Sequence, residues 1–324
     1  MPIAIREFTR KDLSIVVKLI DEDGKGSYEF YPYTEDRFGS WIQGGKLGIL
    51  IAEEDGHICG SAAYDDGYWG EEIQWLIAPE QRNRKLVEAT LLKEAEKFVK
   101  RGTVFSAVDA GSPKIANWMR YGYRLEGGLY HMTAVLNSIK PLPLIPNGVI
   151  LRSLKHSEEK ELVESVNVGF GTERLKIGDV DKWKNESPPF SEDWVQVAEA
   201  NGKIVSAVVA KPDAWFNKSF NARRGYLGPA STFPEYRGKN LASALTVLTM
   251  NFLFEKGMNS VALYTSEQNV ASIGLLQKIG FKTGHHWKFM QKNIDKQTCQ
   301  EACLRSHAFE IRHTGMKYKT VQKI

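Results

Sequence analysis

Two stretches of the chain show the same succession of hydrophobic and polar positions. In the first stretch, a short apolar strand at 3–6 precedes an amphipathic helix expected at 13–20. In the second, a strand at 149–152 precedes a helix expected at 158–168, with Ser157 as its N-cap. Apolar positions in these helices recur at intervals of three and four residues, which is typical of a helix with one buried face. The pattern predicts two similar folding units.

A hairpin pattern follows in both stretches, because alternating apolar and polar positions flank a turn dipeptide. The dipeptides are Asp55-Gly56 and Asn201-Gly202, whose residues readily take the positive φ angles of tight hairpin turns. Asn201 follows Asp55 by 146 positions, and Arg152 follows Arg6 by the same 146. This equal spacing predicts an internal repeat. The strands of the two hairpins are expected at 47–52, 58–64, 194–198 and 204–209.

Each stretch continues with a strand, a long helix, a second strand, a short helix and a glycine-aromatic pair. Pro234 follows its counterpart Pro79 by 155 positions, so the second stretch carries an insertion, which we place near 215–218. Hairpins followed by strand, helix, strand and helix predict an α+β fold. Each copy should have a mixed, mostly antiparallel twisted sheet flanked by helices. The later strands are expected at 72–77, 224–232, 104–108 and 260–264, and the closing pairs are Gly122-Tyr123 and Gly280-Phe281.

The length of 324 residues also favours two domains of ordinary size. A proline-rich segment at 141–148 is stiff and turn-rich, as expected of a linker. We therefore expect an N-terminal domain at 1–140, a C-terminal domain at 149–294 and a tail at 295–324 that is helical.

Composition narrows the functional classes. The 43 basic and 39 acidic residues give a formal charge of +4, too small to require nucleic acid or an anionic membrane but compatible with an anionic cofactor. No apolar stretch is long enough for a membrane-spanning helix, and the first residues lack the pattern of a signal peptide. Three cysteines give no disulfide framework. We expect a cytoplasmic protein that binds neither nucleic acid nor a membrane.

The segment 232–242 carries the strongest candidate chemistry. It joins a strand to a helix that begins near Leu241, and a helix N-terminus presents unpaired backbone N–H groups to an anion. Gly238 removes a side chain from the turn, and Asn240 tolerates left-handed backbone geometry or caps the helix. The small Ala242 keeps the first turn narrow enough for a pyrophosphate to approach. Charge comes from the basic pair Arg237 and Lys239.

This segment resembles motif A of the GNAT acetyltransferases, in which Arg or Gln is followed at fixed spacing by Gly and by Gly or Ala. Arg237 takes the first place and Ala242 the last, while Asn240 stands where the family usually has Gly. A second family motif, an Asn-started helix that ends in Gly-Phe, is similar to 269–281. The resemblance implies acetyl-CoA as cosubstrate and a primary amine of a small molecule or peptide as acceptor. The implied cofactor-binding residues are Thr232, Arg237, Gly238, Lys239, Asn240, Leu241, Ala242 and Asn269.

The family mechanism implied here is direct attack of a neutral amine on the thioester, polarised by backbone N–H groups of 230–232, with Thr232 as the main-chain contact. Leu276 replaces the tyrosine that many members use to protonate the leaving thiolate. Tyr264 and Ser266 are the candidate catalytic hydroxyls in its place. A non-catalytic regulator that binds acyl-CoA is the alternative that Leu276 leaves open.

The base that removes the ammonium proton is not identified by the sequence. Glu267, His285 and His286 are candidates because they lie near predicted strand or helix ends, although a solvated charge or a structural histidine is the more ordinary interpretation.

In the first copy, the counterpart of this loop lies at 82–87 and has lost part of the motif. Its Arg82 matches Arg237, but Lys85 and Val87 stand where small residues belong, and Trp118 takes the tyrosine place of the second motif. We expect this copy to have lost tight CoA binding and to serve as scaffold or as a wall of the acceptor site.

Two further groups of residues have no assigned role. The aromatic residues Trp183, Trp194, Trp215 and Phe216 form either a wall of the acceptor pocket or core packing. In the tail, cysteine and histidine recur every four residues, a spacing that favours one packed helix face over a metal site. The tail residues are Cys299, Cys303, His307 and, close behind, His313.

Overall fold

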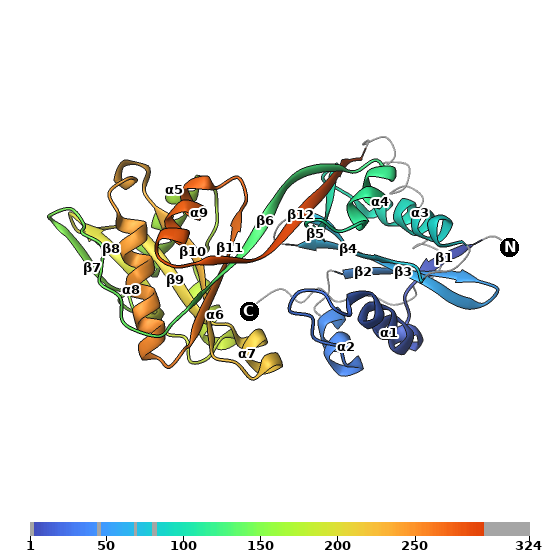
Figure 1. Ribbon diagram of the computed structural model, residues 1–324, viewed down its shortest axis with the longest axis horizontal. Helices are drawn as coiled ribbons and strands as arrows, with labels where there is room; N and C mark the ends of the chain where they lie inside the picture. Colours follow the sequence, from blue (N-terminus) through green and yellow to red (C-terminus); the bar gives the residue numbers. More distant parts are fainter. Residues whose placement is uncertain (1–2, 44–46, 68–69, 80–82, 295–324) are drawn as a thin grey trace. The chain divides into compact units, whose positions relative to one another are not determined.

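The computed structural model describes residues 3–43, 47–67, 70–79 and 83–294, and Figure 1 follows the chain through them. They form two compact units. The first unit comprises 1–126 with 287–324, and the second comprises 127–286.

The first unit is a sheet with helices on both faces. Its strands follow the order β1-β2-β3-β4-β5-β12, and only the β4–β5 pair is parallel. Figure 1 shows α3 and α4 on one face and α1 and α2 on the other. The elements are β1 (Ala4–Glu7), η1 (Arg10–Asp12), α1 (Leu13–Gly24), α2 (Glu35–Gln43), β2 (Leu47–Glu54), β3 (His57–Gly67), β4 (Gly70–Ile77), α3 (Arg84–Ala95), η2 (Glu96–Phe98), β5 (Thr103–Asp109), α4 (Lys114–Arg120) and β12 (Lys282–Asn293).

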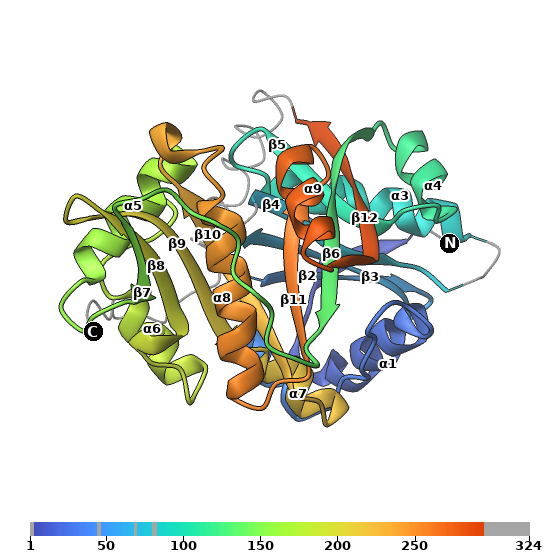
Figure 2. The same ribbon diagram turned by 60° about the vertical axis from the view of Figure 1, so that its left-hand side comes forward.

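The second unit repeats this plan with the strand order β6-β11-β10-β9-β8-β7. Only the β10–β11 pair is parallel. Figure 2 shows the long helix α8 running across these strands. The elements are β6 (Arg124–Val135), β7 (Val149–Ser153), α5 (Glu159–Phe170), α6 (Asp179–Glu186), η3 (Glu192–Trp194), β8 (Val195–Ala200), β9 (Lys203–Pro212), α7 (Ala214–Phe220), β10 (Arg224–Thr232), η4 (Pro234–Tyr236), α8 (Leu241–Glu255), β11 (Ser260–Ser266) and α9 (Val270–Lys278).

Helices α8 and α5 cover opposite faces of this second sheet. A Cβ on Gly225 would lie 2.6 Å from a leucine side chain of α8, and a Cβ on Gly169 of α5 would lie 2.8 Å from Ser231. The β9 partners of Gly225 and Ser231 are Pro212 and Ala207, five positions apart, so the two β10 residues point to opposite faces. We call the side that α5 covers the α5 face.

The division into units differs from the expected domains 1–140 and 149–294, because two strands are exchanged. Strand β6 follows α4 of the first copy in sequence, yet it pairs along Leu129–Val135 with β11 of the second unit. Strand β12 follows α9 of the second copy, yet it pairs along Trp287–Asn293 with β5 of the first unit. Hydrophobic periodicity marks a strand but not its partner, so the sequence could not show this exchange.

The segment expected to be a linker is bound to the second unit. Asn251 of α8 accepts a hydrogen bond from the N–H of Lys140 at 2.9 Å and donates one to its carbonyl oxygen at 2.8 Å. Further along, the side chain of Asn240 donates to the carbonyl oxygen of Leu144 at 3.3 Å. The segment 141–148 therefore passes beside the start of α8.

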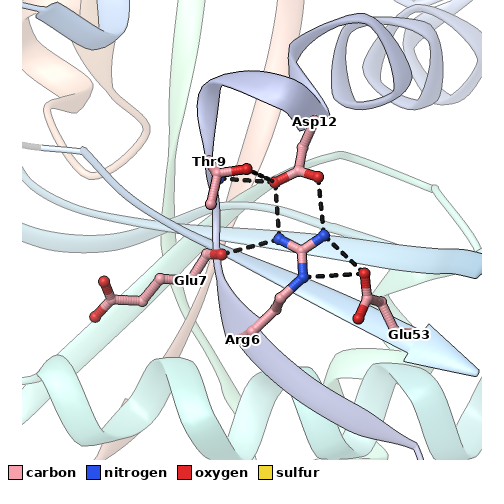
Figure 3. Close-up of polar contacts among 5 residues, drawn as sticks. All are labelled: Arg6, Glu7, Thr9, Asp12 and Glu53. Carbon is pink, nitrogen blue, oxygen red and sulfur yellow. Dashed lines mark hydrogen bonds and ion pairs between the residues drawn. The ribbon is translucent and has the colours of Figure 1, made fainter. Parts of the chain in front are cut away.

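An ion-pair network joins β1, η1 and β2 at the start of the first copy (Figure 3). Arg6 donates from Nη1 to Asp12 Oδ2 at 2.7 Å and from Nε to Glu53 Oε1 at 3.0 Å. Asp12 also accepts the backbone N–H and hydroxyl of Thr9, which caps the turn before α1. The hydrogen bonds from Arg6 hold the pKa of the Asp12 carboxyl well below its usual range.

The same network recurs in the second copy around Arg152. Its Nη1 donates to Glu158 Oε2 at 2.7 Å, and its Nε donates to Glu199 Oε2 at 2.8 Å. Each of these three residues follows its counterpart in the first copy by 146 positions. The repeat inferred from the hydrophobic pattern is thus reproduced by individual side chains. The N-cap position of α5 is occupied by Glu158, whereas the sequence predicted Ser157.

Both predicted hairpin turns have the expected left-handed geometry. The φ angles are 53° at Asp55 and 75° at Gly56, and 51° at Asn201 and 72° at Gly202. Two consecutive positive φ angles match the right-handed twist of the flanking strands, which explains why these dipeptides are used.

Candidate active site

The loop between β10 and α8 has the geometry that the sequence predicted. Gly238 has a φ of 74°, and Asn240, the N-cap of α8, has a φ of 62°. The left-handed turn ends at Leu241, which is 1% exposed and packs in the core of the second unit. Leu241 therefore anchors the loop in the core, while the preceding residues 237–240 are exposed.

The loop presents a row of backbone donors. Within the part of the chain that the structure describes, the N–H groups of 238–243 make no hydrogen bond to a backbone acceptor. They stand at the positive end of α8, a helix of 15 residues. Space above Gly238 is open, since a Cβ there would meet nothing within 4 Å. This arrangement suits a phosphate or pyrophosphate.

The two basic side chains of the loop are held near it. Arg237 donates from Nη2 to the carbonyl oxygen of Gly169 at 2.7 Å and from Nε to that of Thr232 at 3.4 Å. Lys239 places its ammonium 4.8 Å from the ring centroid of Tyr236. Both residues are exposed, so their charge is available to an anion above the loop.

Strands β10 and β11 form a fork beside the loop. They pair in parallel only along Arg224–Tyr226 and Ser260–Ala262. The pairing of β10 with β9 continues to Thr232 but shifts register between Leu227 and Ala230. Along the rest of β10, the edge toward β11 has no strand partner among the described residues, and backbone groups there can bond an extended ligand.

Two residues of the second predicted motif have structural roles at α9. Asn269 caps the helix, since its side chain accepts the N–H of Ser272 at 3.2 Å. Leu276 is 4% exposed and packs in the core of the second unit. It therefore contributes apolar packing at a place where a tyrosine would carry a hydroxyl.

Comparison with known proteins shows which protein family the segment with this loop and fork matches. Residues 158–281 match the family model described as Acetyltransferase (GNAT) family. This match covers α5 to α9 and includes both motifs. The second copy therefore contains a GNAT acetyltransferase domain.

Relatives and solved structures extend the likeness beyond the matched segment. The mycothiol acetyltransferase of Nocardia farcinica is 24% identical over 267 residues, which is 78% of this chain and 86% of that protein. The one from Saccharomonospora viridis is 25% identical over 229 residues, which is 66% of this chain and 72% of that protein.

Among solved structures, a GCN5-related N-acetyltransferase from Sphaerobacter thermophilus has a TM-score of 0.67 and 17% identity, covering 90% of this chain and 95% of its own. A tandem GNAT protein from the clavulanic acid biosynthesis pathway has a TM-score of 0.61 and 14% identity, covering 90% and 98%. This chain has the fold of a tandem GNAT protein. The family match and the curated relatives make it an enzyme of the N-acetyltransferase class that uses acetyl-CoA as cosubstrate.

The two hydroxyls nominated for catalysis in this GNAT protein lie in different environments. Tyr264 is 40% exposed and its ring stacks on His131 at a centroid distance of 4.7 Å, within reach of the fork. Ser266 ends β11 and accepts the N–H of Gln268 at 3.3 Å, so it shapes the turn that leads to α9.

Two of the three nominated bases are brought together. His286 Nε2 lies 2.6 Å from Glu267 Oε2, and the imidazole packs on the ring of Tyr130 at 4.3 Å. His285 is half-buried on the neighbouring position of β12. Glu267 lies just beyond the last residue of β11, and the Glu267 and His286 side chains are hydrogen-bonded to each other.

The four nominated aromatic residues do not form one wall. Trp194 is 1% exposed and packs edge-on against Phe252 in the core. Trp183 lies beneath the ammonium of Lys211, 4.7 Å from its ring centroid. Phe216 lies under the guanidinium of Arg224 at 3.2 Å, and Trp215 is 46% exposed on the same helix.

The first copy lacks the loop geometry of the second. Helix α3 begins at Arg84, and the N–H groups of Leu86 and Val87 already bond the carbonyl oxygen of Asn83 at 2.9 and 3.0 Å. None of the described residues 83–87 has a positive φ angle. Arg84 is engaged by Glu88, with Nε and Oε1 2.9 Å apart.

Val87 stands where the sequence alignment places a counterpart of Ala242. It is 1% exposed and packs in the core of the first unit, while Leu86 is 58% exposed. Val87 therefore fills core space in the first copy. Arg82 lies outside the described residues.

Other expectations concern metals and membranes. In the ranges that the structure describes, no group of three or more His, Cys, Asp or Glu residues could hold a metal ion. No helix in those ranges is long and apolar enough to span a membrane. The tail residues Cys299, Cys303, His307 and His313 lie outside the described ranges.

Proposed function

We propose that the second unit transfers the acetyl group of acetyl-CoA to a primary amine of a small molecule or peptide. The observation that carries this proposal is the fork of β10 and β11 beside a loop of unpaired N–H groups. The loop 237–242 binds the pyrophosphate, and the pantetheine arm bonds the free edge of β10 as an added strand would. The thioester then lies in the fork.

The acetyl-transfer step needs no protein nucleophile. The amine attacks the thioester carbonyl directly, the C–N bond forms and the C–S bond breaks. Backbone groups at 230–232, with Thr232 as the main-chain contact, polarise the carbonyl, and Asn269 orders the start of α9 beside the cosubstrate. Of the two nominated hydroxyls, Tyr264 is the better placed to protonate the CoA thiolate, because Ser266 is used in a turn.

The acceptor is proposed from the fold of the second unit and from the relatives. Curated relatives that cover most of this chain are named mycothiol acetyltransferases, which supports a small-molecule acceptor. The partly exposed aromatic residues of α7 and the half-buried Lys211 and Tyr226 are compatible with either a small molecule or a peptide terminus.

Thiol release from acetyl-CoA with a panel of small amines, amino sugars and peptides tests this function. We expect release above the rate of acetyl-CoA hydrolysis with at least one amine, and loss of that release in Arg237→Ala. Arg223→Ala is the matched control, because Arg223 is exposed one residue before β10. If acetyl-CoA binds tightly but no amine releases thiol, the protein is a regulator that binds acyl-CoA.

A further inference from the structure

Four polar and aromatic side chains form a row across the sheet of the second unit. Register pairs Lys211 of β9 with Tyr226 of β10, and Tyr264 of β11 with His131 of β6. The rings of Tyr226 and Tyr264 are 6.0 Å apart, and those of Tyr264 and His131 are 4.7 Å apart. Since Lys211 and Ala207 are an even number of positions apart, the row lies on the α5 face.

Tyr226 stands where the fork opens. It is the last residue of β10 that pairs with β11. Its ring and hydroxyl lie against Gly228, two residues further along the strand. A Cβ on Gly228 would lie 3.4 Å from Tyr226 Cε1 and 3.6 Å from its hydroxyl oxygen. The phenol oxygen therefore lies at the closed end of the fork, next to the proposed place of the thioester.

Lys211 carries a positive charge on β9, directly opposite Tyr226 in the strand register. Its side chain is half-buried against the ring of Trp183, and within the described residues its ammonium has no hydrogen-bond acceptor and no carboxylate within 4.0 Å. Burial lowers the pKa of Lys211, an effect that Lys182 reinforces and that Glu186 and Asp179 of α6 oppose. A phenolate opposite Lys211 would give this ammonium a counter-charge.

The other charged groups around Tyr226 are already engaged. Arg224, two residues earlier on the same strand, is paired with Asp213 through Nη2 and Oδ2 at 2.8 Å. His131 stacks on Tyr264 and is 1% exposed. Lys211, the register partner of Tyr226 on β9, is therefore the charged residue on which the inference is built.

We infer that Tyr226 is the base that removes a proton from the acceptor ammonium, and that Lys211 positions and stabilises its phenolate. The inference rests on the proposed function. The phenolate oxygen takes one proton from R–NH3⁺ and later returns it to solvent. The neutral amine then forms the C–N bond as the C–S bond breaks, Tyr264 protonates the CoA thiolate, and the second nitrogen proton restores the Tyr264 phenol. The sum is acetylated amine, CoA thiol and one released proton.

The sequence did not nominate Tyr226, because only strand register brings it together with Lys211. The nominated pair Glu267 and His286 is bonded internally beyond the end of β11, whereas Tyr226 lies at the opening itself. Alternation along β10 could have placed Tyr226 on one face, but no sequence pattern indicates its neighbour on β9.

Substitutions with a full pH profile of kcat/KM test the inference. Tyr226→Phe keeps the ring and should lower kcat/KM for the amine about 10²-fold with an unchanged Kd for acetyl-CoA. Lys211→Met should move the acidic limb of the profile upward by about one pH unit or more, because removing a positive neighbour raises the pKa of the base. Lys203→Met, which removes an exposed charge from the same strand, should leave that limb in place.

Tyrosinate absorption gives a readout that needs no acceptor. We expect one tyrosine to titrate below the ordinary value of about 10. Its signal should be missing in Tyr226→Phe and shifted to higher pH in Lys211→Met. If the wild type acetylates amines but Tyr226→Phe stays within twofold of it, or Lys211→Met leaves limb and titration unmoved, the inference alone is wrong. If no amine is acetylated, the proposed function fails and the inference with it.

Discussion

Arg237 donates a hydrogen bond to the carbonyl oxygen of Gly169 at 2.7 Å, which ties the loop before α8 to the end of α5. Gly169 can approach that closely because it has no side chain, since a Cβ there would lie 2.8 Å from Ser231 Cβ and 3.2 Å from Thr232 N. The guanidinium is thus held beside the loop before a cosubstrate arrives, and less side-chain entropy is lost when it binds.

Removing the guanidinium should weaken cosubstrate binding. A charge-assisted contact to phosphate contributes about 1.5–3 kcal/mol, so Arg237→Ala should raise the Kd for acetyl-CoA about 10- to 100-fold. Titration calorimetry at low and high salt measures the effect, which should shrink as salt rises. An Arg223→Ala protein with the same loss would show that net charge, and not the loop contact, is responsible.

Adding a single carbon at Gly169 should disturb the same region through packing. Gly169→Ala forces α5 away from β10, so we expect a loss of about 1–3 kcal/mol in the free energy of unfolding and a weaker Kd for acetyl-CoA. Gly39→Ala is the matched control, because a Cβ on Gly39 of α2 meets nothing within 4 Å. That variant should be neutral or more stable. Equal melting temperatures for the Gly169→Ala and wild-type proteins would contradict the packing described here.

The left-handed residue before α8 should tolerate glycine but not a β-branched side chain. With φ at 62°, Asn240→Gly should keep the loop and bind acetyl-CoA within a fewfold of the wild type. Asn240→Val should cost about 1–3 kcal/mol of backbone strain, seen as a lower melting temperature and a higher Kd. If valine were tolerated as well as glycine, the left-handed turn would not be needed for binding.

One equivalent of CoA should bind per chain. Among the described residues 83–87, the first copy has no left-handed turn, and the N–H groups of Leu86 and Val87 bond the carbonyl oxygen of Asn83, so we expect no comparable anion site there. Calorimetry should give a stoichiometry of one, and Arg82→Ala should leave the Kd unchanged while Arg237→Ala raises it. Two equivalents, or equal damage from both substitutions, would show a working site in each copy.

The charge on Glu72 should make the first unit less stable as pH rises. Burial, and the Asp65 carboxylate directly across the strand pair, raise the pKa of Glu72 to about 7, against about 4.3 unfolded. The folded state therefore holds this proton more tightly. Its contribution is fully present below about pH 4 and is lost as pH rises through 7.

Glu72→Gln should accordingly raise stability by about 1–3 kcal/mol at pH 8 and change little at pH 4, measured by urea unfolding. Its neighbour gives the opposite control. Glu71 accepts the N–H groups of Lys100 and Arg101 at 2.7 and 2.6 Å, so Glu71→Gln should destabilise. A stabilising effect of Glu72→Gln that is the same at both pH values would exclude the raised pKa as its cause.

The sequence predicted those features that depend on local chemistry. The equal spacing of Arg6 and Arg152 revealed the repeat, and asparagine at 240 and 201 indicated left-handed turns that the structure contains. Features that depend on strand pairing were missed. The fork and the Lys211–Tyr226 pair follow from which strand lies beside which, and hydrophobic alternation does not specify that.

The exchange of β6 and β12 fixes the order in which the protein can be completed during synthesis. The sheet of the first unit lacks β12 until residue 293 has left the ribosome, although β1 to β5 were made long before. A ribosome that stops after the first copy therefore releases a sheet with the edge of β5 exposed. Deleting the first copy would also remove β6 from the sheet that carries the proposed acetyltransferase site.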